Sequence, residues 1–263
     1  TCHAQGTYPL AYYPHNNHFL SATATMEGNQ KWALSAAYKV RNYISKTLMQ
    51  DPAWSTLQHY YTIPFFILIK FGSWNQILNA AEPSTLIYPQ AIFHYARGMA
   101  YIGLDQLDSA QSELRMLSAM AKDSTLQQMT IWGINKMSDI VSIASLMLDA
   151  KIHQHNKDYN ESISLFKKAI AMEDALNYQE PPDWFFSIRH ELGDALIVAK
   201  NYRDAIKTYN EDLAWWPKNG WALSGLCKVY ALTNNTAALT TREQELGEAW
   251  KYADTELEGS RVK

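Results

Sequence analysis

Histidine is the residue type in this sequence with the widest choice of chemistry, and eight histidines occur among the 263 residues. His15 and His18 lie three positions apart, a spacing that places both imidazoles on one face of a helix. Neutral imidazoles bind Zn²⁺ or Cu²⁺, and protonated imidazoles bind anions. Because a protein metal site needs at least three convergent ligands, this pair needs a third side chain from another element.

Motifs of the known catalytic and nucleotide-binding kinds are missing. The sequence has no glycine-rich phosphate loop, no H-E-x-x-H, no C-x-x-C and no G-x-S-x-G. The net charge is −3, so the clustered Lys and Arg that bind nucleic acid are not indicated either. These absences favour a binding protein over an enzyme and argue against a nucleic-acid partner.

The composition is that of a chain able to bury a core. Hydrophobic residues make up 47% of the 263 positions, which is ample for one or two domains. The longest apolar run, residues 63–71, contains Pro64 and Lys70 and is much shorter than the roughly 20 residues of a membrane span. We therefore predict no membrane-spanning segment.

The ends of the sequence leave the cellular compartment open. Cys2 and Cys227 lie near opposite ends and give no disulfide framework. The chain begins abruptly at Thr1 without a recognisable signal peptide. We interpret it as a processed or truncated piece, the C-terminal part of a longer chain, for which exported and cytoplasmic locations both stay open.

Helical hairpins are the elements that must position these side chains. The clearest repeat carries Leu192, Gly193, Ala205, Tyr209 and Pro217 at the spacing of the tetratricopeptide (TPR) pattern L-G, then A-x3-F, then P. The two small residues let paired helices approach closely, and the tyrosine is expected to wedge against the next pair. Gly193 is thus predicted to be buried at a helix crossing.

The same spacing recurs along the chain and predicts six hairpins. Three hairpins match well, with Gly98, Ala150 and Gly193 at the small-residue position, one matches more weakly, with Gly225, and two match loosely, with Ser21 and Phe65. We therefore expect an all-α fold of TPR-like antiparallel helix hairpins, stacked as a right-handed superhelical solenoid in a single domain over residues 1–263. Two intervals exceed the standard repeat, which predicts lengthened helices over residues 124–148 and a long loop over residues 173–184.

The repeat register places a set of polar side chains in the concave groove of such a stack, because the first helix of each hairpin lines it. The groove-facing positions are occupied by His15, His18, His59, Tyr95 and His190. We expect His15, His18 and His59 to open onto one surface, where Zn²⁺ or Cu²⁺ is the candidate metal, and His153 and His155 to lie elsewhere. His94 is expected to face the second helix of its own hairpin.

The acidic, proline-containing loop over residues 173–184 is the second candidate site. Glu180 and Trp184 are expected to reach the groove, and Glu173 with Glu180 forms a candidate pair of carboxylates. The alternative is structural: a rigid turn in which Asp183 caps a helix that begins at Trp184.

Tryptophan is concentrated late in the chain. Trp215, Trp216 and Trp221 fall within seven residues. They serve either as a ligand platform or, as such residues more often do, as packing between successive hairpins.

Three phrases resemble a bacterial family of TPR-containing proteins of unknown function. They are YYPHNNHFL at residues 12–20, the segment 173–184 with its EPPDW ending, and the segment 211–223. The resemblance extends over nearly the whole chain. It implies a TPR fold, and it implies an upstream helical segment with a further histidine motif that this sequence does not contain.

The sequence as a whole predicts a non-enzymatic scaffold that binds a peptide or protein partner in its concave groove. The alternative is a metal-binding or small-molecule-binding protein, possibly metal-dependent in its action, that uses the groove histidines.

Overall fold

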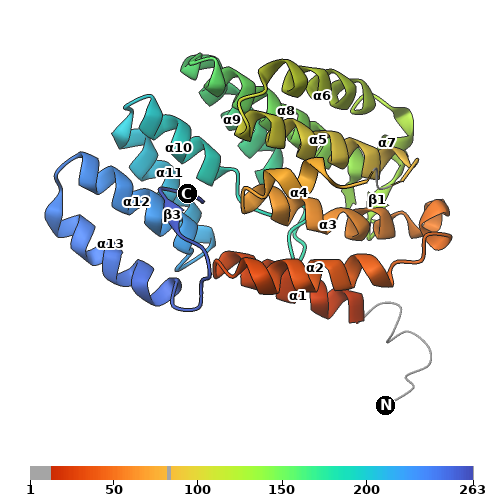
Figure 1. The fold of residues 1–263 in the computed structure, drawn as a ribbon, viewed down its shortest axis with the longest axis horizontal. Coiled ribbons are helices and arrows are strands. Elements are labelled where there is room, and N and C mark those ends of the chain that lie inside the picture. The colour runs from red at the N-terminus through yellow and green to blue at the C-terminus, as the bar shows by residue number, and fades with distance from the viewer. Residues whose placement is uncertain (1–12, 82–83, 263) are drawn as a thin grey trace.

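The computed structural model describes residues 13–81 and 84–262, and in that part of the chain helix hairpins follow one another (Figure 1). The paired helices are α1 (Tyr13–Met26) with α2 (Gln30–Tyr43), α3 (Thr56–Lys70) with α4 (Trp74–Leu78), α5 (Ile87–Gly103) with α6 (Leu107–Met120), α8 (Met137–His155) with α9 (Tyr159–Asp174), α10 (Arg189–Val198) with α11 (Tyr202–Trp215), and α12 (Gly220–Leu232) with α13 (Thr236–Ala249). The expectation of an all-α fold is confirmed. Cys2 lies outside the described residues, and Cys227 is a free, partly buried thiol.

The turn inside each hairpin has the same construction. In all six described hairpins a residue with positive φ directly precedes the position that caps the second helix; these residues are Gly28, Gly72, Asp105, Lys157, Lys200 and Asn234. In several hairpins an Asn or Asp at the cap, such as Asn29 or Asp158, accepts a hydrogen bond from a backbone N–H of the first helical turn. This repeated turn reverses the chain and sets the two helices side by side.

Short elements fill the longer connections. They are η2 (Leu48–Gln50), η3 (Pro52–Trp54), α7 (Ser124–Gln128), β1 (Thr130–Ile131), β2 (Asn135–Lys136), β3 (Leu257–Glu258) and β4 (Arg261–Val262). Strand β1 pairs antiparallel with β2, and β3 with β4.

The prediction of lengthened helices over residues 124–148 was wrong for the first half of that range. Helix α7 ends at Gln128, and a β-hairpin follows before α8 begins at Met137. The helix cannot continue because Trp132 and Gly133 both have positive φ, 55° and 73°. A hairpin turn with Trp at such a position carries no strong sequence signal.

Close packing between hairpins depends on glycines, as the repeat pattern predicted. Tyr209 is fully buried between Gly193 and Gly225, and a Cβ atom at either glycine would lie 2.3 Å from the Tyr209 ring atom Cζ. Gly98 is packed in a similar way against Leu148. The Tyr209 ring thus fills the space that a missing side chain leaves in its own hairpin, at Gly193, and in the next hairpin, at Gly225.

The last hairpin returns to the first, which the sequence did not predict (Figure 1). The indole N–H of Trp221 in α12 donates a hydrogen bond of 2.9 Å to the backbone oxygen of Thr25 in α1. Beyond α13, the Asp254 carboxylate accepts hydrogen bonds from the first backbone N–H groups of α2, and the Trp250 ring packs on Gly28. The stack therefore closes into a ring.

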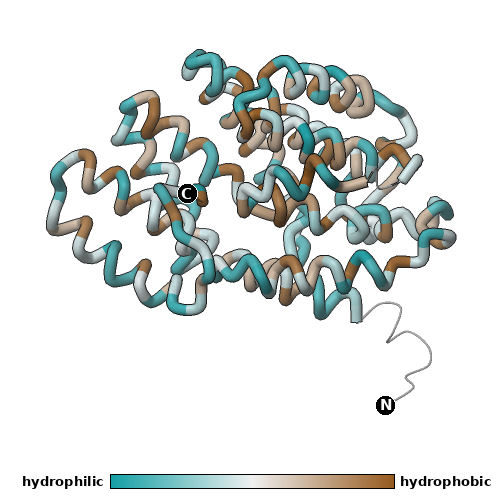
Figure 2. The backbone as a smooth tube through the Cα atoms, in the orientation of Figure 1, coloured by the Kyte–Doolittle hydropathy of each residue, from teal (hydrophilic) through white to brown (hydrophobic). Residues whose placement is uncertain are grey.

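Figure 2 shows hydrophobic and hydrophilic residues alternating along the helices rather than gathering in one long apolar segment. In the described part of the chain, no helix has the length and apolar character needed to cross a membrane.

Substitution of Gly193 tests the packing between hairpins. Gly193→Ala should lower the free energy of unfolding by about 1–3 kcal/mol, because its Cβ collides with a ring that has no room to move. Gly247→Ala in α13 is the matched control, since a Cβ there meets nothing within 4 Å. The control should stabilise the protein by up to about 1 kcal/mol. Denaturant unfolding measures both, and equal effects of the two substitutions would contradict the packing.

Candidate functional site: two cavities on the inner face

The first cavity, which we call the central cavity, lies among the inner helices and has a volume of about 590 Å³. Aromatic and aliphatic side chains from α3, α5 and α8 line it together with several charged groups. The charged lining residues are Lys70, Lys151, Glu191, Lys228, Glu258 and Arg261. Apolar walls with a few fixed polar groups are the usual make-up of a ligand site.

The segment between α9 and α10 fills part of the inner face that was expected to be an open groove. The Trp184 ring lies 5.6 Å from that of Phe66 and 5.8 Å from that of Tyr95. The Phe185 ring stacks on His18 at 5.2 Å with an angle of 11° between the planes. Tyr95 and Trp184 are 3% and 4% exposed, so they form a packed wall of the central cavity rather than a free surface.

Asp183 holds this segment in place, but not as the helix cap that the sequence suggested. Helix α10 begins only at Arg189. Asp183 instead accepts a hydrogen bond of 2.8 Å from the Asn135 side chain in β2, and Asn135 also bonds the backbone of Asn177. The β1–β2 hairpin and the segment are thereby fixed to each other.

The proposed carboxylate pair is divided between two places. Glu173 accepts a hydrogen bond from the backbone N–H of Ile188 at 3.2 Å, and burial raises its pKa to about 8. Glu180 is exposed and accepts a hydrogen bond from Tyr178. Each carboxylate has its own partner, so joint acid–base chemistry is not indicated.

Most cations of the central cavity are paired. Lys151 lies 2.9 Å from Glu191, and Arg261 lies 2.5 Å from Asp194. Lys70 differs, because no carboxylate within the described residues makes an ion pair with it. Glu191 and Asp212 act on its ammonium group only from beyond ion-pair distance.

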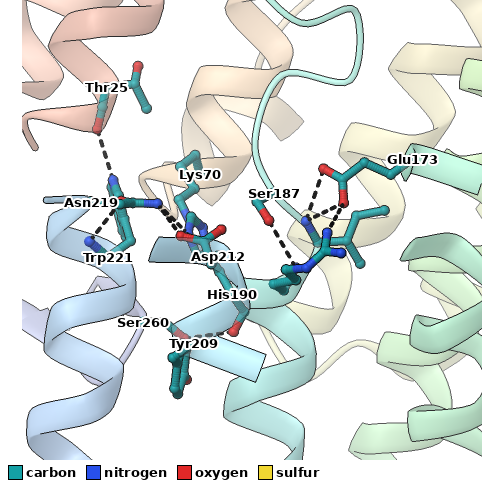
Figure 3. Close-up of polar contacts among 12 residues, drawn as sticks. Thr25, Lys70, Glu173, Ser187, His190, Tyr209, Asp212, Asn219, Trp221 and Ser260 are labelled. Carbon is teal, nitrogen blue, oxygen red and sulfur yellow. Dashed lines mark hydrogen bonds and ion pairs between the residues drawn. The ribbon is translucent and has the colours of Figure 1, made fainter. Parts of the chain in front are cut away.

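Lys70 is held by His190 and by an aromatic ring (Figure 3). Its Nζ lies 3.0 Å from Nδ1 of His190 and 4.0 Å from the centre of the Trp221 ring. Burial is the largest effect on Lys70 and lowers its pKa to about 8. Since an ammonium group only donates, Nδ1 of His190 is the acceptor and this imidazole is neutral.

His190 is therefore a structural centre rather than a groove residue. It is fully buried, its pKa is lowered first by burial and then by Lys70, and its Nε2 lies 3.3 Å from the Asp212 carboxylate. The Asn219 amide nitrogen donates a hydrogen bond of 2.7 Å to Asp212 and lies 2.8 Å from Nε2 of His190, which carries the ring proton and is directed at the same carboxylate (Figure 3). The sequence placed His190 in the groove, and the structure places it beneath the cavity wall.

The second cavity, which we call the histidine pocket, has a volume of about 270 Å³. Its lining residues are His15, His18, Tyr60, Trp132, Gln179, Glu180, Pro181 and Asp183. Three of the predicted site residues, His15, His18 and Glu180, are thus brought together. His59 lies behind them, with its ring centre 6.2 Å from that of His18 and its Nδ1 2.8 Å from the Tyr88 hydroxyl.

Both inner histidines of this region are kept neutral. Burial, followed by the nearby His59 and His15, lowers the pKa of His18 well below its usual value. Burial alone lowers the pKa of His59 to about 3. Among the described residues, no group of three or more His, Cys, Asp or Glu side chains is arranged to hold a metal ion. A metal at His15, His18 and His59 stays a prediction.

Three further histidines have local partners, and His3 lies outside the described residues. His94 Nδ1 lies 2.5 Å from Glu113 in α6, the second helix of its own hairpin, as predicted. His153 pairs with Asp158 and His155 with Asp105, away from the histidine pocket.

Sequence reasoning missed two of the three lysines that line the central cavity. Lys70 and Lys151 each occur near the end of a mainly apolar first helix, α3 and α8. A single cation in such a helix was the available signal, since buried lysine is rare without a specific reason. Arg261 carried no such signal, because it lies in a terminal hairpin.

No protein-family model, curated protein or solved structure matches the chain in the three comparisons made.

A pH series tests the neutral state of His59. Its folded pKa lies below its unfolded value, so the unfolded chain binds more protons and stability falls as the pH drops below about 6.5. His59→Asn should flatten the dependence by about 1.4 kcal/mol per pH unit between about pH 4 and 5.5. His153→Asn, at a partly exposed residue, is the control. Unfolding curves of both variants with the same slope as the parent would exclude a neutral, buried His59.

Proposed function

We propose that this chain is a TPR-like helical-repeat scaffold that binds a peptide or protein segment at the central cavity through an acidic group next to an apolar one. The recurring hairpin turn and the glycine-dependent packing support the repeat assignment. Repeat proteins offer extended inner surfaces for binding rather than preformed catalytic clefts. The lack of known catalytic motifs in the sequence is consistent with this choice.

The observation that carries the proposal is Lys70. It lines the cavity, and within the described residues it has a neutral histidine and an indole ring as partners but no ion-paired carboxylate. An incoming carboxylate would supply the missing negative charge and form charge-assisted hydrogen bonds. Nearby, Phe66, Tyr95 and Trp184 offer aromatic surface for an apolar side chain.

The size of the cavity sets the scale of the ligand. About 590 Å³ falls in the range of small-molecule sites and also accepts two or three residues of a peptide. A free small acid and the acidic end of a peptide share the chemistry that Lys70 recognises, so the test must separate them.

Calorimetry with short probes provides this test. The probes are an acetylated tetrapeptide that ends in Phe-Leu, as free acid and as amide, and 4-phenylbutyrate. We expect the free acid to bind at least about tenfold more tightly than the amide, because only the acid pairs with Lys70. Lys70→Met should remove that difference, whereas Lys207→Met on the outside of α11, 75% exposed, should not.

The pH dependence gives a second readout on the folded parent protein. Lys70 loses its charge as the pH rises through about 8, so binding of the free acid should weaken there and take up a proton. The other charged or titratable groups that interact electrostatically with Lys70 are Lys151, His190, Glu191, Asp212 and Arg261. Equal binding of acid and amide would overturn the proposal, and preference for 4-phenylbutyrate over the peptide would replace the peptide by a small acid.

A further inference from the structure

The histidine pocket differs from the central cavity in the sign of its charge. Within the described part of the chain, its lining includes two carboxylates, Glu180 and Asp183, and no lysine or arginine. Asp183 is 4% exposed, whereas Glu180 is exposed. The pocket thus has an acidic group in its interior and another on the exposed segment beside it.

Asp183 has no counter-ion in the described part of the chain. One of its oxygens, Oδ2, accepts a hydrogen bond of 2.8 Å from the neutral Asn135 amide. Burial raises the pKa of Asp183 to about 6, so the group still carries its charge at neutral pH. A buried carboxylate with one neutral partner is costly and calls for a cation.

His18 is the second unsatisfied group. It is 2% exposed, and neither of its ring nitrogens has a hydrogen-bond partner among the residues that the structure describes. Most buried polar side chains in proteins are hydrogen-bonded, so an imidazole with two free nitrogens points to a missing partner. Because stacking on Phe185 fixes the ring and burial keeps it neutral, its lone pair is available to a donor.

Two aromatic rings form the apolar wall of the same pocket. Tyr60 and Trp132 meet edge to face with their ring centres 6.0 Å apart, and the Trp132 indole N–H donates to the Tyr60 hydroxyl at 3.0 Å. This bond fixes the Trp132 side chain, which is 48% exposed. Rings held in this way attract cations through their electron-rich faces.

We propose that the histidine pocket is an alkylammonium-binding site, in which Asp183 is the counter-ion, His18 accepts a further hydrogen bond, and Tyr60 and Trp132 contact the alkyl chain. An ammonium group has three donors and a positive charge, which matches the Asp183 carboxylate and the unpartnered His18 imidazole. The ligand is a free amine or the side chain of a lysine in a partner. This site is separate from the acid-binding cavity and does not depend on it.

The first experiment compares charged and neutral probes of equal shape by calorimetry or ligand-observed NMR at pH 7.5. Two probes of similar shape are n-butylammonium and the neutral n-butanol. The third is the methylamide of lysine acetylated on its α-nitrogen, which keeps the charged side chain. We expect n-butylammonium to bind and n-butanol, which lacks the charge, to bind at least about tenfold more weakly. Tighter binding of the lysine derivative would identify a protein side chain as the ligand, and tighter binding of n-butylammonium a free amine.

The second experiment removes each negative charge without changing the shape of the side chain. Asp183→Asn should weaken n-butylammonium binding by about tenfold or more, and Glu180→Gln, on an exposed residue, by less. Asp108→Asn, on the exposed start of α6, is the matched control and should leave binding unchanged. Since Glu180 is exposed, its variant keeps the test valid even if Asp183→Asn fails to fold.

Lowering the pH should release the probe, because Asp183 is protonated below about pH 6. The other titratable groups that line the pocket or act on it are His15, His18, His59, Tyr60, Tyr88 and Glu180. Protonation of any histidine would add repulsion in the same direction.

Three results would overturn the proposal. They are equal binding of n-butanol and n-butylammonium, no binding of any amine up to about 10 mM, and unchanged binding in both acidic-residue variants. Stoichiometric binding of Zn²⁺ that n-butylammonium does not displace would likewise overturn it, in favour of a metal site.

Discussion

The hydrogen bond from the Trp221 indole to the Thr25 carbonyl joins the last hairpin to the first, and the inner architecture depends on that closure. Trp221 is fully buried and contacts the rings of Phe71 and Trp250. Without it, the stack of hairpins would end in two exposed faces. With it, the inner helices surround a cavity instead of lining an open groove.

The closure also brings buried polar groups together, so that hydrogen bonds among them offset part of the free-energy cost of their burial. Asn219 and Trp221 belong to one turn of chain at the start of α12, so docking of the indole on α1 brings the Asn219 amide against His190 and Asp212. Although burial opposes it, the pKa of Asp212 is lowered, because His190, Ser187 and Asn219 stabilise the charge. Hydrogen bonds among these groups offset part of the cost of removing them from water.

The repeat spacing was sufficient to predict the helices and their close contacts, because these are local properties. Gly193 and Tyr209 lie in one hairpin and Gly225 in the next, and the two glycines show in the sequence where the tyrosine ring must fit. The prediction of an open groove failed for a different reason. Whether Trp184 and Phe185 point into the groove depends on the Asp183–Asn135 bond, whose partners lie 48 positions apart.

The candidate sites likewise combine features that could be predicted from the sequence with features that could not. The proximity of His15 and His18 follows from helix geometry and was predictable. Lys70 can be recognised as a candidate binding residue only from its surroundings, which are a neutral His190 from α10 and the ring of Trp221 from α12. No local pattern in the sequence encodes contacts of that range, and the ring closure determines them.

Exchange of the Trp221 indole proton with solvent tests the ring closure most directly. In protein labelled with ¹⁵N at tryptophan, Trp221→Phe assigns the resonance, and Trp215, which is 71% exposed, gives the reference for a free indole. The account predicts that the Trp221 indole proton exchanges as slowly as the buried backbone amides of α3, because both open only with the fold. Exchange as fast as that of Trp215 would mean that the first and last hairpins are apart in solution, and the closed ring would be contradicted.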